Sequence, residues 1–143
     1  METIKKIMLF VLLAASSDSV FSIDASEKIK VTPILKTLNS WDGKKIVYPE
    51  GTAEVTGMII EMAPGGETGW HLHPVPSFGF VLEGELEVLF KNGDVKHLST
   101  GQSAAEAVNV LHNGRNVGEV PLKLVVFYMG TTDKQLTIKE GEE

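Results

Sequence analysis

"GWHLHPVPSFGFVLEGELEV", residues Gly69 to Val88, holds two of the chain's four histidines and the pattern that decides its fold. After His71 and His73 the stretch reads as a buried strand, a glycine turn and a second strand. Side chains alternate faces along a strand, so these two imidazoles point the same way, roughly 6.6 Å apart. That spacing lets both reach one metal ion, whose bonds to nitrogen are roughly 2.0–2.1 Å for zinc. Taken alone, His-x-His is more often polar surface.

The remainder of the chain favours an all-β fold, because short β-branched and aromatic runs alternate with turn residues. The expected strands are Glu54–Met62, Gly79–Gly84, Glu85–Phe90, Val95–Leu98 and Pro121–Gly130. Lys91–Asp94 contains Asn-Gly, which is typical of a type I′ hairpin turn. We expect two strands and a loop in Ile23–Pro49, and a frayed acidic tail in Lys139–Glu143.

Length, charge and the N-terminal pattern limit what the chain can be. Its 143 residues allow one domain, and a net charge of -6 excludes nucleic acid as a partner. "METIKK", the apolar run "IMLFVLLAA" and the small residues after it have the order of a secretory signal peptide. The alternative is a buried N-terminal helix or strand. We expect residues 1–22 to be removed and residues 23–143 to form a single secreted or periplasmic domain. No membrane anchor is expected in the mature form, because the chain has no cysteine to carry a lipid.

A second segment, "GQSAAEAVNVLHNGRN" (Gly101–Asn116), places another histidine, His112, eleven residues after its first glycine. The two segments together resemble the two motifs of the cupin superfamily. The first motif is Gly, five residues, His-x-His, three or four residues, Glu, six residues and Gly. The second is Gly, five residues, Pro-x-Gly, two residues, His, three residues and Asn. The positions in register are Gly65, His71, His73, Gly84, Gly101, His112 and Asn116.

The resemblance implies a fold and a metal site. The fold is a jelly-roll β-barrel, also called a double-stranded β-helix. His71, His73 and His112 would converge inside it on a divalent metal ion, which could be Fe, Zn, Ni, Mn or Cu. His97 lies outside both motifs, and we expect it on the surface. Small cupins often pair, so a homodimer is expected.

The sequence departs from the family where a ligand matters most. Ser77 stands in place of the first motif's glutamate, and Ala107 and Asn109 stand in place of the proline and glycine of the second motif. We therefore hypothesise a three-histidine site with an open fourth position near Ser77. Glu106, six residues before His112, could serve as a fourth ligand, a partner of a histidine or a general base. The alternative, which we favour at this point, is that Glu106 faces solvent.

Other pocket candidates come from residue type alone. Asn109 either points its amide into the pocket or fills a turn position with positive φ. Glu67 is expected in an exposed turn. The aromatic candidates for pocket or core are Trp70, Phe78, Phe80, Phe127 and Tyr128.

The leading functional hypothesis is an exported small cupin that binds a divalent metal through three histidines. It would be an enzyme, dioxygenase-like, on a small organic substrate. The alternatives are a non-catalytic module that binds a small ligand, and a zinc-dependent hydrolase or isomerase. Whether the chain is an enzyme at all stays open at this stage.

Overall fold

The computed structural model describes residues 28–142 of the chain. The expected signal peptide and its cleavage site near Ile23 lie outside the described residues. The chain divides into two units, Met1–Thr32 and Pro33–Glu143. In the first unit the described residues, 28–32, are exposed and form no strand. Within residues 28–142 no helix is long and apolar enough to cross a membrane.

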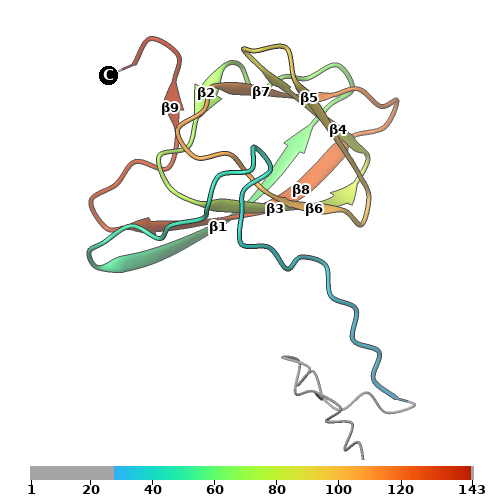
Figure 1. Ribbon diagram of the computed structural model, residues 1–143. Coiled ribbons are helices and arrows are strands. Elements are labelled where there is room, and N and C mark those ends of the chain that lie inside the picture. The colour runs from blue at the N-terminus through green and yellow to red at the C-terminus, as the bar shows by residue number, and fades with distance from the viewer. Residues whose placement is uncertain (1–27, 143) are drawn as a thin grey trace, which may run out of the picture. The chain divides into compact units, whose positions relative to one another are not determined.

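Two antiparallel sheets face each other in the second unit (Figure 1). One has the order β1 (Ala53–Met62), β8 (Leu122–Thr131), β3 (Ser77–Glu83) and β6 (Ser103–Ala105). The other has the order β5 (Val95–Ser99), β4 (Glu85–Phe90), β7 (His112–Asn116), β2 (His71–Leu72) and β9 (Ile138–Lys139). The described residues therefore confirm the all-β prediction and the five expected strands, with bounds that shift by up to two residues.

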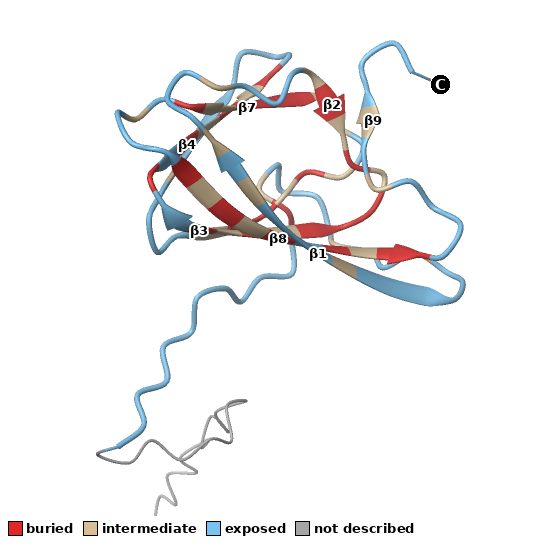
Figure 2. Ribbon diagram, turned by 180° about the vertical axis from the view of Figure 1, so that it is seen from behind, coloured by how far each residue is buried: buried red, intermediate tan, exposed pale blue. Residues whose placement is uncertain are grey.

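Alternation along the strands builds the core between the sheets. On β4, Leu86, Val88 and Phe90 are buried, while their neighbours in the strand are not. β8 repeats the pattern, and its inward side chains include Leu122, which is fully buried. Figure 2 shows this alternation of buried and less buried residues along β8. The buried apolar cluster consists of Val75, Val81, Leu86, Val88, Phe90, Ala107, Leu122, Leu124, Val126 and Tyr128.

Two residues of the sequence motifs, Gly84 and Asn116, stabilise the connections between strands. Gly84 joins β3 to β4 with a φ of +84°, and a Cβ there would lie 2.9 Å from the Cα of Leu122. Only glycine combines that backbone with that close approach. Asn116 is buried, and its amide donates to the carbonyl oxygens of Met62 (2.9 Å) and Val120 (2.8 Å). These contacts tie the end of β7 to the end of β1 and to the connection that leads into β8.

Three local predictions were wrong. The described part of Ile23–Pro49 contains no strand pair, only an isolated bridge between Asn39 and Lys45. In the Lys91–Asp94 hairpin only Gly93 has positive φ, whereas a type I′ turn needs positive φ at Asn92 as well. The Asn92 side chain instead accepts a hydrogen bond from the backbone N–H of Asp94 (3.0 Å), within the four-residue connection between β4 and β5. The tail is also more ordered than expected, because Ile138–Lys139 forms β9 against β2.

Candidate metal centre

The pairing of β2 with β7 brings the histidines together. His71 lies directly opposite His112 in this ladder, and their ring centroids are 4.4 Å apart. His73 follows β2 on the same face, with its ring 4.9 Å from that of His71 and 5.1 Å from that of His112. All three side chains are buried, and one nitrogen from each lies within 4.8 Å of the others. Distances of this size suit three ligands around a single ion.

Hydrogen bonds to backbone carbonyl oxygens fix how each imidazole is presented. The Nδ1 of His71 lies 2.8 Å from the oxygen of Gly69, and the Nδ1 of His112 lies 2.8 Å from that of Val110. The Nδ1 of His73 lies 2.8 Å from the oxygen of Leu136. A carbonyl oxygen only accepts, so each Nδ1 carries the proton and each Nε2 keeps a free lone pair. Every ring is thus in the tautomer that binds a metal through Nε2.

Burial keeps the three imidazoles neutral. It lowers the pKa of His71, of His73 and of His112, because the charged form loses hydration inside the barrel. The carboxylate of Glu106 acts against burial on all three pKa values, so its charge faces the whole cluster. Neutral imidazole is the form that coordinates a metal, and the site therefore needs no further deprotonation near neutral pH.

Glu106 belongs to this site, and the solvent-facing position that the sequence favoured for it is wrong. The residue directly follows β6, and its N–H donates to the carbonyl oxygen of Ser77 on β3 (2.9 Å). Its Oε2 accepts a hydrogen bond from the Ser77 hydroxyl (2.5 Å) and lies 3.5 Å from Nε2 of His73. The pairing of β3 with β6, rather than a regular strand running on to His112, turns this carboxylate inward.

A small cavity of about 40 Å³ lies inside the barrel against the histidines. Such a volume holds an ion and one or two water-sized groups. Its polar lining comprises the three histidines, Glu106, Thr68 and Tyr128. Burial, with the nearby Glu106 charge, raises the pKa of Tyr128 to about 12, so its phenol stays protonated. The remaining side chains of the lining are aliphatic: Ile60, Met62, Leu86, Val88 and Leu124.

Other candidates lie away from this cavity. Trp70 does not line it, because its ring packs under the Lys91 ammonium, 3.9 Å from the ring centroid. Asn109 is exposed and has a φ of +56°, so it fills a turn position rather than the pocket. His97 is on the surface, 3.6 Å from a Glu87 oxygen.

Of the remaining aromatic candidates, Tyr128 lines the cavity and Phe127, next to it on β8, is exposed. Phe78 and Phe80 are half-buried and alternate with the inward residues of β3. Glu67 is half-exposed, as expected for its turn, and accepts a hydrogen bond from Asn113 (3.0 Å).

Sequence reasoning missed the contribution of the C-terminal segment. The carbonyl oxygen of Leu136 accepts from His73, and the Thr137 hydroxyl lies 3.2 Å from the same Nδ1. β9 extends this contact by pairing with His71 and Leu72. Nothing in residues 132–142 has a ligand pattern, and a backbone carbonyl carries no sequence signature. The segment could be found only from the three-dimensional structure.

A larger, open groove of about 680 Å³ lies beside Trp41, Phe90 and Leu72. None of the histidines lines it. Phe90 lines the groove, and its ring lies 6.2 Å from that of His112. The groove therefore borders the metal centre without opening directly onto the ligand atoms.

The donor set fits a divalent cation. Three neutral imidazoles offer lone pairs toward one point, and a carboxylate supplies negative charge beside them. Among the residues described, no lysine or arginine pairs with Glu106. A buried carboxylate with no cation is costly, so an ion bound by the histidines would supply the missing charge.

Comparison with known proteins places this geometry in a family. The cupin domain family matches residues 58–128, a range that contains the three histidines and both motif regions. No curated protein matches the sequence.

Three solved structures share the fold. The DMSP lyase DddQ of Ruegeria pomeroyi has a TM-score of 0.53 at 21% identity, over 62% of this chain and 44% of its own. The oxalate decarboxylase of Lactobacillus farciminis, as a formate complex, has 0.52 at 20%, over 59% and 26%. An uncharacterised Klebsiella pneumoniae protein with a double-stranded β-helix domain has 0.51 at 24%, over 66% and 91%.

This chain thus spans less than half the length of the first two proteins. At such identities the likeness concerns the fold, and it confirms the expected double-stranded β-helix. With the family match and the two-sheet architecture, the chain belongs to the cupin family.

Proposed function

We propose that this cupin is a metal-dependent enzyme that holds one divalent ion on His71, His73 and His112 and acts on a small organic substrate. The observation that carries the proposal is the shared tautomer. Each Nδ1 is bonded to a backbone carbonyl oxygen, which leaves three Nε2 lone pairs toward a common point. Packing alone would not require three buried histidines to lie together in the same Nδ1–H tautomer.

The cavity suggests the class of substrate. A bound divalent ion supplies a Lewis acid that polarises an oxygen ligand. A divalent ion next to the single carboxylate of Glu106 would leave the centre with one net positive charge, which favours a small anion such as a carboxylate. The Tyr128 phenol keeps its proton and can donate a hydrogen bond to a substrate oxygen. The cavity is small, and about 40 Å³ admits only a few non-hydrogen atoms beside an ion.

The test begins with the metal content of natively purified protein. We expect close to one divalent ion per chain in the wild type, and severe loss of metal in His71→Ala, His73→Ala and His112→Ala, because each variant removes one ligand. His97→Ala is the control and should bind as the wild type does. Equal metal content in all four variants would end the proposal.

Turnover then separates the classes of function. Metal-loaded protein is incubated with a panel of small carboxylates while oxygen uptake and product formation are followed. Iron with oxygen uptake supports the dioxygenase-like reaction, and zinc with hydrolysis or isomerisation supports the other catalytic class. A bound metal with substrate binding but no turnover supports the non-catalytic module.

Two further proposals concern the whole protein. We propose that it is exported, on the pattern of residues 1–22, and N-terminal sequencing of the mature protein should then begin near Ile23. An intact Met1 in exported material would contradict this. We also propose a homodimer, supported by exposed apolar side chains on β1 and β8.

A further inference from the structure

The carboxylate of Glu106 is unusual among the acidic side chains of this protein. Its side chain is only 11% exposed, and its Oε2 lies 3.5 Å from Nε2 of His73. Glu87 is almost as buried, at 14% exposed, but it is paired with the Arg115 guanidinium at 2.6 Å. In the part of the chain that the structure describes, Glu106 has no lysine or arginine partner, and its nearest nitrogen belongs to a neutral imidazole.

Ser77 supplies only one of the hydrogen bonds that the Glu106 carboxylate can accept. Its hydroxyl donates one hydrogen bond of 2.5 Å to Oε2, and it is itself 1% exposed. An ionised carboxylate offers about four lone-pair sites. The neighbouring imidazoles are neutral and present Nε2 lone pairs, which cannot donate to the remaining sites. A cation at the centre of the cluster would satisfy both the imidazoles and the carboxylate.

The position of Glu106 is set by the backbone as well as by the hydroxyl. Its N–H donates to the Ser77 carbonyl oxygen at 2.9 Å, so the two residues are tied together at both main chain and side chain. β3 and β6 are neighbours in one sheet, which fixes this contact within the fold. The Ser77 hydroxyl therefore restrains the direction in which the Glu106 carboxylate points.

We propose that Glu106 is the fourth protein ligand of the metal and that Ser77 is the positioning residue that aims it. The proposal rests on the proposed metal centre and adds its charged ligand. The fourth position is then filled from the end of β6, although the corresponding site on β3 is a serine. Ser77 binds no metal in this arrangement.

The experiment measures metal binding rather than turnover. Chelator-treated protein is titrated with Co²⁺ and Mn²⁺, and the visible spectrum of Co²⁺ reports the coordination geometry. We expect Glu106→Gln to weaken binding on the order of 100-fold and to change the Co²⁺ spectrum. Ser77→Ala should weaken binding about tenfold, the effect expected when the partner of a ligand is lost. Glu87→Gln is the matched control, since it removes a similarly buried carboxylate outside the cavity.

Stability of the metal-free protein separates a ligand from a structural carboxylate. If Glu106 is a metal ligand, its carboxylate has no cation beside it in the metal-free protein. Removing the carboxylate should then leave the melting temperature of the metal-free protein unchanged or raise it. A structural role predicts a lowered melting temperature in both the metal-free and the loaded protein. Glu106→Leu, apolar and of similar size, carries the same test should Glu106→Gln fail to fold.

The outcomes are distinct. Wild-type affinity and an unchanged Co²⁺ spectrum in the Glu106 variant, with binding lost in His73→Ala, would overturn this proposal and leave the histidine centre intact. Retained binding in His73→Ala as well would overturn the proposed function. Unchanged affinity and spectrum in Ser77→Ala would remove Ser77 from its positioning role.

Discussion

Each of the three histidines at the centre of the barrel is held, by a hydrogen bond to a backbone carbonyl oxygen, in the tautomer that can bind a metal. The acceptors are the carbonyl oxygens of Gly69, Leu136 and Val110, which cannot move without moving the backbone. Rotation of a ring would break its Nδ1 hydrogen bond at a largely buried position, where a polar group left without a partner is costly. The geometry of the ligands is therefore set before any ion arrives.

The same burial makes the metal-free protein sensitive to acid. It lowers the pKa of His71, of His73 and of His112 below the usual 6.5, while the unfolded chain keeps the usual value. Well above pH 6.5 all three are neutral in both the folded and the unfolded state. As pH falls below 6.5 the unfolded chain takes up protons first, so stability falls. Each histidine contributes at most about 1.4 kcal/mol per pH unit.

Urea unfolding of chelator-treated protein between pH 7.5 and 5.0 measures this loss. The free energy of unfolding should fall with pH in the wild type, and less steeply in His112→Gln. His97→Gln is the control, because His97 is exposed and its removal should leave the slope unchanged. A flat profile in the wild type would show that the three imidazoles are not held neutral by the fold.

Residue spacing identified the three histidines but not their carboxylate. His71, His73 and His112 have fixed places in two motifs, and those motifs correspond to strands that pair. Glu106 depends instead on the register between β3 and β6, which places it beside Ser77. Register between segments 29 residues apart leaves no trace in the spacing of a single sequence. The solvent-facing interpretation of Glu106 failed for this reason.

At the scale of elements, the sequence predicted strands best where one face of a strand packs against the core, because apolar and polar residues then alternate along it. β4 and β8 lie close to their expected bounds because inward and outward side chains differ along them. The N-terminal stretch carries β-branched residues too, but a strand needs a partner. Ile34 meets β6 through a side-chain bond from the Ser103 hydroxyl to its carbonyl oxygen, not through a ladder.

The C-terminal segment acts on the metal centre from outside the cavity. Its Leu136 carbonyl oxygen fixes the His73 tautomer, and β9 pairs with the strand that carries His71. Glu140 adds an exposed ion pair at 2.8 Å to Lys91, the residue that follows β4. The C-terminal segment contains no histidine of the cluster, but its contacts position His71 and His73.

Ending the chain after Asp133 should therefore weaken metal binding about 10- to 100-fold, although every ligand remains. The two main sheets keep their other pairings, so cooperative unfolding should persist. Titration with Co²⁺ measures the affinity, and urea unfolding checks the fold. A chain that lacks only Glu142 and Glu143 is the control. Wild-type affinity in the longer truncation would show that the tail has no part in the site.

At the scale of the whole molecule, the outer face of the β1–β8–β3 sheet is apolar and open. Val55 is 60% exposed, Ile59 64% and Phe127 46%. Register places Gly57 opposite Phe127 and Phe127 opposite Phe78, so the apolar side chains run across three strands.

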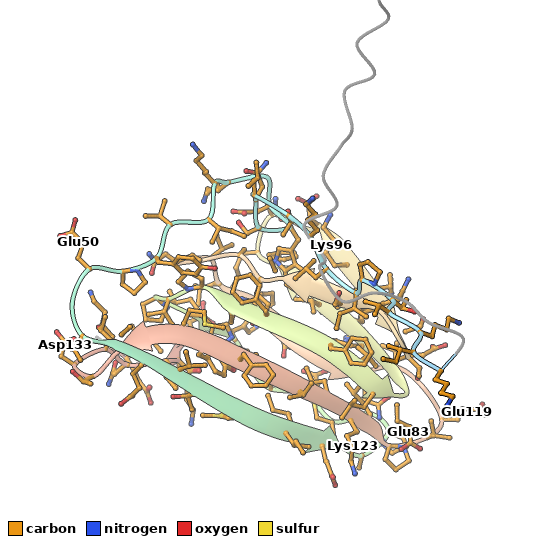
Figure 3. The ribbon with its side chains drawn as sticks, turned by 90° about the horizontal axis from the view of Figure 1, so that it is seen from below. Glu50, Glu83, Lys96, Glu119, Lys123 and Asp133 are labelled. Carbon is orange, nitrogen blue, oxygen red and sulfur yellow. The ribbon has the colours of Figure 1, made fainter. Side chains whose placement is uncertain are left out.

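Charged residues flank this face, and one of its edges is free. Figure 3 looks onto the sheet and shows Lys123 and Glu83 toward one end and Glu50 and Asp133 toward the other. β1 is also an edge strand, and Figure 2 shows it largely exposed. A broad apolar face next to an unpaired edge is typical of a surface that another protein covers.

A second copy of the chain is the occupant that we propose for this face. The mature protein should then scatter light as a dimer at micromolar concentration. Ile59→Asp should shift it to the monomer, because a carboxylate buried without a partner opposes association. Ile59 points away from the cavity, so the variant should keep wild-type affinity for Co²⁺, which shows that the barrel is intact. Leu38→Asp, at a side chain that is 80% exposed outside this sheet, is the matched control and should stay dimeric. A wild-type protein that is monomeric across micromolar concentrations would contradict the proposal, as would an Ile59→Asp protein that remains a dimer.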